Sequence, residues 1–235
     1  MFAIYKKELK TYFTSMLGYL TMGFFLLLSI LFFNGYFLGL RNTNDFSGFF
    51  SDLNTALLFI MPILCVRILA EDKKLSTYEL LLTSPVSSFE IVFAKYLAVL
   101  TFVSTGIVML IFYPVLISFF VYVDFRIVLS NILGIFLTAA FFLSIGVFAS
   151  AITDSYVLSG IISFGIFILL FILSSVIKSI DQNWFVFLKE FSFIYHYEKF
   201  VSGLIELKNI FYFFAGITLW LFLAKSLIEV KVWKS

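Results

Sequence analysis

The chain has 235 residues, of which 62% are hydrophobic, 21% aromatic and 13% charged, and its formal net charge is +2. A soluble domain carries about a quarter charged residues, and a globule of this size cannot bury so many apolar side chains. Composition therefore excludes a soluble enzyme, a disordered tail and a disulfide scaffold, and it predicts an integral membrane protein.

Residues 1–15 predict an amphipathic helix lying at the inner face of the membrane. Phe2, Tyr5, Leu9 and Phe13 fall near one helical face, and the lysines of this segment lie elsewhere. The alternative is a basic tail that only sets the topology. The apolar stretch that follows is longer than the roughly 7–15 residues of a signal-peptide core, so we expect an uncleaved anchor.

Six stretches are apolar for about the 20 residues that a spanning helix needs. A β-barrel strand would alternate apolar and polar positions, and these stretches do not alternate. We therefore expect an all-α membrane protein with six transmembrane helices in a single domain covering 1–235. The stretches are 16–40, 53–70, 91–122, 128–152, 156–177 and 210–229.

The distribution of basic residues predicts the orientation of the spans. If the N-terminus lies inside, the inner segments hold ten of the 16 Lys and Arg residues. Basic residues favour the cytoplasmic side of a membrane. The sequence therefore predicts a multi-pass protein of the cell (inner) membrane with both termini in the cytoplasm.

The cytoplasmic loop at 71–90 contains two Ser-x-x-Glu capping boxes. The first, at 76–79, predicts a short amphipathic helix around 77–83, and Pro85 predicts its end because the residue before a proline avoids helical geometry. The second box, at 87–90, predicts the start of the third span.

The outer segment at 178–209 is too long and too apolar for a plain loop. It predicts two short helices that lie in the outer interface or re-enter the membrane before the last span, with Ser192 and Gly203 as helix breakers. An additional span is disfavoured because charged residues such as Glu198 and Lys199 would be carried into lipid.

Most catalytic and metal-binding motifs are missing from the sequence. No Gly is followed by Lys, so there is no P-loop, and His196 is the only histidine, which excludes a His-rich metal site. We expect His196 to pack or to form hydrogen bonds, and Cys65 to be a buried thiol. No basic tract indicates nucleic-acid binding.

The fully apolar parts of the spans contain no Asp, Glu, Lys or Arg. Pumps driven by ion gradients commonly place such groups at mid-membrane, so a gradient-driven transporter is disfavoured. Pro62 and Pro114 lie inside spans and predict kinks. Several small residues predict close packing of helices. They are Gly134, Ala139, Ala140, Gly146, Gly160 and Gly165.

The first cytoplasmic loop resembles that of ABC-2 type transporter permeases. The resemblance lies in an acidic pair, a basic pair, a Thr, a Glu-Leu-Leu run and a final Pro, with Ser76 where the family usually has Gly. The segment at 192–209 resembles the gliding-motility-associated branch of these permeases. The matching loop residues are Glu71, Asp72, Lys73, Lys74, Thr77, Glu79, Leu80, Leu81 and Pro85.

This resemblance implies that the short cytoplasmic helix is a coupling helix that docks on a separate ABC ATPase subunit. It implies no catalytic, cofactor-binding or metal-binding residue in this chain, since ATP and Mg²⁺ would bind to the partner ATPase. It also implies a second permease copy or a related permease subunit, contact with membrane lipid, and room for an accessory extracytoplasmic protein. The expected ATPase-coupling residues are Glu71, Lys73, Lys74, Thr77, Tyr78, Glu79, Leu80 and Leu81.

The leading hypothesis is therefore the permease subunit of an ATP-driven exporter. The alternatives are a gradient-driven transporter or channel, an intramembrane enzyme, and a non-transporting membrane anchor for an ATPase. The sequence indicates no substrate, because phenylalanine is also the ordinary filler of lipid-facing helices.

Overall fold

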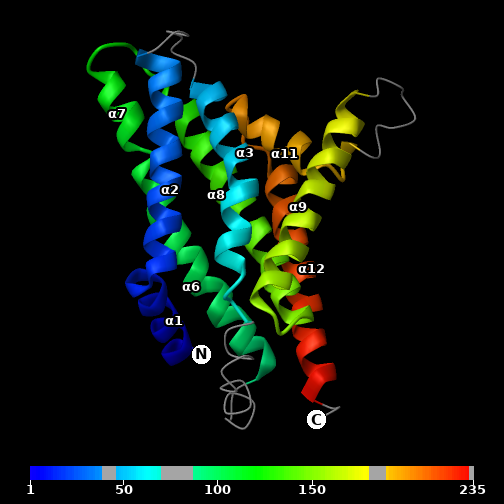
Figure 1. Ribbon diagram of the computed structural model, residues 1–235. Coiled ribbons are helices and arrows are strands. Elements are labelled where there is room, and N and C mark those ends of the chain that lie inside the picture. The colour runs from blue at the N-terminus through cyan, green and yellow to red at the C-terminus, as the bar shows by residue number, and fades with distance from the viewer. Residues whose placement is uncertain (39–45, 70–86, 180–188, 233–235) are drawn as a thin grey trace.

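The computed structural model describes residues 1–38, 46–69, 87–179 and 189–232 (Figure 1). These residues form helices joined by turns, and no strand occurs among them. The all-α prediction is confirmed. The physical reason is that a helix satisfies its own backbone hydrogen bonds, which lipid cannot do.

Six helices of the described chain are long and apolar enough to cross a membrane. This confirms the number of spans predicted from the sequence. The spans are formed by α2 (Met16–Phe33) with the π-helix η1 (Asn34–Leu38), α3 (Phe46–Cys65), α6 (Ser88–Met109) with α7 (Phe112–Ser118), α8 (Phe125–Ile152), α9 (Tyr156–Ser179) and α12 (Leu207–Val232). Two shorter helices are α1 (Phe2–Thr14) and α11 (Phe193–Val201).

The bundle has two ends that carry different elements. Helix α1 and the C-terminal part of α12 lie at one end, here called the α1 end (Figure 1). Helices α7 and α11 lie at the opposite end, here called the α11 end (Figure 1). Both ends of the chain therefore lie on the same side of the bundle, as an even number of spans requires.

Helix α8 is the central helix and packs against α3, α6, α9, α11 and α12. Its glycines allow this close contact. A methyl group on Gly146 would overlap the sulfur of Cys65, and one on Gly134 would come within 2.8 Å of Phe200. The packing role expected for Gly165 is not found within the chain, because a methyl group there would meet no atom of the described residues within 4 Å.

The second span begins seven residues earlier than the sequence predicted, at Phe46 instead of residue 53. Polar side chains at the start of this helix indicated a loop, but the fold gives them hydrogen-bond partners. Tyr36 donates a hydrogen bond to the Asp52 carboxylate at 2.8 Å, and Ser47 donates to the Val201 carbonyl at 3.3 Å. Because their partners lie in other segments, hydropathy along the sequence could not reveal them.

The third span is broken between α6 and α7, at residues 110–111. Pro114 lies four residues after this break begins. A proline has no N–H to donate to the carbonyl of the residue four positions before it, which interrupts the helical ladder. The helix is therefore interrupted next to Pro114, where the sequence predicted a disturbance of the span.

Candidate functional site

The predicted coupling residues lie at 70–86, outside the described residues. The structure therefore places none of Glu71, Lys73, Lys74, Thr77, Tyr78, Glu79, Leu80 and Leu81. The helix expected around 77–83 and its capping box at 76–79 fall in the same range. The structure describes the two segments that flank this loop at the α1 end of the bundle. They are Ile68 and Leu69 before it and the start of α6 after it, and together they are called the frame here.

The frame after the loop begins with a capping box at the start of α6. The Ser87 hydroxyl accepts a hydrogen bond from the Glu90 amide at 3.3 Å, and the Glu90 carboxylate accepts from the Ser87 amide at 3.1 Å. These reciprocal bonds satisfy two amides that a helix start leaves free. The predicted box is confirmed, and it defines where the loop ends and the span begins.

The frame before the loop is anchored to the central helix. Ile68 and Leu69 follow the last turn of α3 and are almost fully buried. The Leu69 amide donates a hydrogen bond to the Ser150 hydroxyl of α8 at 2.9 Å. The chain therefore enters the loop from a point fixed on α8 and leaves it at the capped start of α6.

A buried ion pair joins the N-terminal helix to the same span. The Lys95 ammonium of α6 lies 2.9 Å from the Glu8 carboxylate of α1, and the side chains are 2% and 13% exposed. Buried charges are tolerated when they are paired at this distance. The pair lies about two turns from the capping box, at 3.6 residues per turn.

Apolar and hydroxyl contacts add to this attachment of α1. The hydroxyls of Tyr5 and Thr101 are hydrogen-bonded at 3.1 Å, and the rings of Phe13 and Phe102 meet edge to face at 5.1 Å. Ser15 then caps α2 through the Gly18 amide at 3.0 Å. The first residues thus form a helix, as predicted, and this helix is fastened to α6.

The burial of Lys95 was not predicted from the sequence. Lys95 was counted as one of the basic residues on the inner side, and only the fully apolar parts of the spans were expected to lack charged residues. The structure buries it in α6, because α1 folds back and brings Glu8 to it. The one available signal was a lysine inside an apolar run, which in a membrane protein indicates a partner.

At the opposite end, α11 is inserted among the spans. Ser192 caps the helix by accepting from the Tyr195 amide at 3.3 Å, and Gly203 ends the segment with a positive φ of 79°. Both predicted breakers are therefore confirmed. Helix α11 is one of the two short helices expected in the outer segment, and residues 180–188 of that segment lie outside the described residues.

The buried face of α11 is formed by Phe193, His196, Tyr197 and Phe200. The Tyr197 hydroxyl donates to the Phe50 carbonyl of α3 at 2.9 Å. Burial raises the pKa of Tyr197 above its ordinary value, so the hydroxyl keeps its proton and remains a donor.

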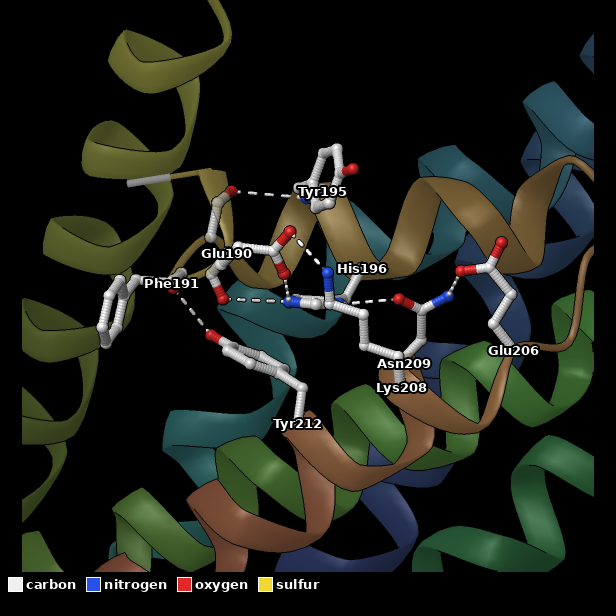
Figure 2. A network of polar contacts seen from close by, with 9 residues as sticks. Glu190, Phe191, Tyr195, His196, Glu206, Lys208, Asn209 and Tyr212 are labelled. Atoms are coloured by element: carbon white, nitrogen blue, oxygen red, sulfur yellow. Dashed lines mark hydrogen bonds and ion pairs between the residues drawn. The ribbon is translucent and has the colours of Figure 1, made fainter. Parts of the chain in front are cut away.

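Figure 2 shows His196 at the centre of a polar network that joins α11 to the start of α12. One ring nitrogen lies 2.7 Å from the Asn209 side-chain oxygen, and the other lies 3.0 Å from the Glu190 carbonyl oxygen. The ring also stacks on Tyr212 with centroids 4.1 Å apart. The prediction that His196 packs and forms hydrogen bonds is confirmed.

The partners of His196 are themselves oriented. The Asn209 amide nitrogen donates to the Glu206 carboxylate at 3.3 Å, which turns its oxygen toward the ring (Figure 2). Both ring nitrogens therefore face oxygens that accept. A neutral imidazole has one N–H and can donate to only one of them, whereas a protonated ring donates to both.

The part of the chain that the structure describes holds no group of three or more His, Cys, Asp or Glu side chains arranged to bind a metal ion. An apolar cavity of about 550 Å³ lies between α6, α8 and α12. Its walls include Phe93, Phe136 and Phe222. Such a space at the side of a membrane bundle suits hydrocarbon, since it offers almost no hydrogen-bonding group.

Comparison with known proteins gives one family. The model of the family described as ABC-2 type transporter matches residues 1–205, which is the chain from α1 to the turn after α11. No curated protein matches the chain.

Proposed function

The chain belongs to the ABC-2 type transporter family, and from this premise we propose that it is the permease subunit of an ATP-driven exporter, coupled to a separate ABC ATPase. The observation that carries the proposal is the family match over most of the chain, together with six helices suited to spanning a membrane. The chain is thus an integral membrane transport protein of this family. ATP coupling and export are the proposed parts.

Coupling is proposed to pass through the loop at 71–90. Its expected contacts with the ATPase are the acidic, basic and apolar positions that resemble the family's first cytoplasmic loop. The described frame supports this role, because the loop is attached to α8 at Leu69 and leads into α6 at Ser87. Movement of the loop would therefore be passed directly to two spans.

The α1 end of the bundle is proposed to face the cytoplasm of the cell (inner) membrane. This side carries the N-terminal lysines and the loop at 71–90, so the basic-residue rule favours it. The α11 end would then face outward. A second permease subunit, identical or related, would complete the transport path, and an accessory protein would meet the α11 end.

The test is co-purification of the tagged chain with the ATPase of its host, followed by transport measurements on the same variants. Glu79→Lys reverses a charge in the loop, and Leu81→Asp removes an apolar contact. Both should insert normally, because no span is changed, but should lose ATPase association or ATP-driven transport. Lys234→Glu, a charge reversal in the C-terminal tail, is the control.

The outcomes separate the alternatives. Normal ATPase binding and transport in both loop variants would show that 77–83 does not couple. ATPase association without any ATP-dependent movement of cargo would favour a membrane anchor. Transport that persists without an ATPase would favour a gradient-driven carrier.

A further inference from the structure

The polar network around His196 links three segments at the α11 end. It joins the residues just before α11, α11 itself and the start of α12 (Figure 2). His196 and Asn209 are 2% and 1% exposed, and a ring nitrogen lies 2.7 Å from the amide oxygen. No other molecule fits between two atoms at this distance. A proton carried by one of these two groups must therefore make the contact favourable.

The orientation of the Asn209 amide decides which group carries that proton. Its nitrogen donates to the Glu206 carboxylate at 3.3 Å. If the amide turned over, its oxygen would face this carboxylate, which only accepts hydrogen bonds. Two acceptors that face each other repel, so Glu206 keeps the amide oxygen on the side of His196. The proton in the contact must therefore come from the imidazole ring.

The other ring nitrogen faces an acceptor that cannot turn over. It lies 3.0 Å from the backbone carbonyl oxygen of Glu190. A neutral imidazole has one N–H, so one of the two contacts is then left between an unprotonated nitrogen and an oxygen. A protonated ring donates at both positions. The arrangement of the two oxygens therefore favours the protonated ring.

Burying a charge opposes protonation, and the groups around the ring offset this cost. One oxygen of the Glu190 carboxylate lies 4.0 Å from the ring nitrogen that faces the carbonyl, while the other pairs with the Lys208 ammonium at 2.6 Å. The faces of aromatic rings attract cations, and Tyr212 stacks on the imidazole. Tyr195 meets it edge to face. Among the described residues, α3, α8 and α9 contribute no hydrogen bond, ion pair or ring contact to the imidazole.

We propose that His196 is a proton-binding site that latches α11 to the start of α12. Histidine is the side chain whose charge ordinarily changes between about pH 5 and 8. In acid the ring donates to Asn209 and to the Glu190 carbonyl together. At alkaline pH it keeps only the proton that faces the carbonyl, and the bond to Asn209 is lost.

The sign of the pH effect follows from the number of bonds. The folded protein offers an acceptor to each N–H of the protonated ring, so the attachment is strong in acid and weakens as the pH rises. Because α12 is the last span and packs on the central helix α8, the latch sets how firmly α11 is held to the bundle. It depends neither on an ATPase nor on which side of the membrane this end faces.

The first measurement follows the proton itself. His196 is the only histidine of the chain, so isotopically labelled histidine gives the nitrogen NMR signals of this ring alone, provided that the purification tag contains no histidine. The full chain is studied in detergent at about pH 5 and about pH 8, the limits of ordinary histidine titration. Both ring nitrogens should carry protons at the acid limit. At the alkaline limit only the nitrogen that faces the Glu190 carbonyl should do so.

The second measurement follows the attachment of α11 by limited proteolysis, with a protease that is active over the same pH range. His196→Gln keeps one donor and one acceptor but does not change its charge. At the acid limit the wild type should be cleaved between α11 and α12 about two- to tenfold more slowly than this variant, as expected for one hydrogen bond. At the alkaline limit the two rates should be nearly equal.

A third variant tests the role of Glu206, which forms no hydrogen bond or ion pair with the ring among the described contacts. In Glu206→Gln the new amide offers a donor as well as an acceptor, so the Asn209 amide can turn over and give its N–H to a neutral ring. The difference between acid and alkaline cleavage rates should therefore shrink. The matched control is Glu229→Gln at the other end of α12, where the carboxylate pairs with Lys225 at 3.4 Å; it should leave the difference unchanged.

A ring that carries the same number of protons at both pH values would overturn the proposal. So would a cleavage rate that keeps the same ratio between wild type and His196→Gln from acid to alkaline pH. If His196→Gln does not fold, the NMR measurement and Glu206→Gln still decide, and a Glu206→Gln that behaves like Glu229→Gln would also refute the latch. None of these outcomes bears on coupling, which the loop variants test separately.

Discussion

Neutralising the carboxylate of the buried Glu8–Lys95 pair should loosen the N-terminal helix from the bundle. Glu8→Gln removes the charge that lies 2.9 Å from an ammonium that is only 2% exposed. Breaking a buried ion pair by removing one partner typically costs about 3–5 kcal/mol. We expect the lower part of this range, about 3 kcal/mol, because glutamine keeps an oxygen that accepts from Lys95.

Replacing the other partner of the pair, Lys95, should lower the free energy of unfolding by less. Lys95→Met leaves Glu8 behind, and this carboxylate is 13% exposed, so it retains some access to water. Replacing both residues, with Glu8→Leu and Lys95→Met together, should recover most of the lost stability, since apolar replacements of buried ion pairs are often neutral or stabilising. From most to least stable, the expected order is therefore wild type, double variant, Lys95→Met and Glu8→Gln.

The assay is thermal unfolding of the purified chain in detergent, with all variants compared in a double-mutant cycle. For a chain of 150–250 residues, about 1 kcal/mol corresponds to roughly 2–4 °C in Tm, so Glu8→Gln should lower Tm by about 6–12 °C. Limited proteolysis should cleave α1 faster in the same variant. If Glu8→Gln and Lys95→Met melt like the wild type and α1 stays protected, the pair does not fasten α1.

Three further predictions concern packing, hydrogen bonding and topology. Gly146→Ala places a methyl group on the sulfur of Cys65 and should destabilise by about 1–3 kcal/mol, with partial recovery in Cys65→Ala; no recovery in the thermal unfolding of the double variant would contradict the contact. Tyr197→Phe removes the hydroxyl that donates to the Phe50 carbonyl of α3 and should cost about 0.5–1.5 kcal/mol, measured by the same unfolding assay, where an unchanged Tm would refute the bond. A reporter fused after residue 235 should lie in the cytoplasm, and one inserted within 180–205 should lie outside; inverted results for both would reverse the proposed orientation.

The number of spans could be predicted from the sequence because lipid leaves few choices. Each span needs about 20 apolar residues and must satisfy its backbone internally, so composition along the chain is enough to find them. The helix start at Ser87 and the breakers Ser192 and Gly203 are likewise local, since capping and positive φ depend on a few neighbouring residues. The ABC-2 resemblance was also carried by one contiguous loop.

Only the tertiary structure showed the hydrogen bonds and ion pairs between residues that are far apart in the sequence. The sequence placed Asp52 in no span because its polarity argues against lipid, and only the fold supplies the Tyr36 hydroxyl that satisfies it. Lys95 is buried where α1 folds back against α6 and brings the Glu8 carboxylate to it.

The same holds for the polar groups at the α11 end. Asn54 lies in a polar stretch of the sequence, and only the fold shows that its side chain is buried. Local patterns therefore determined the elements and the family resemblance. The fold determined which charges and amides are buried, because burial depends on residues far apart in the chain.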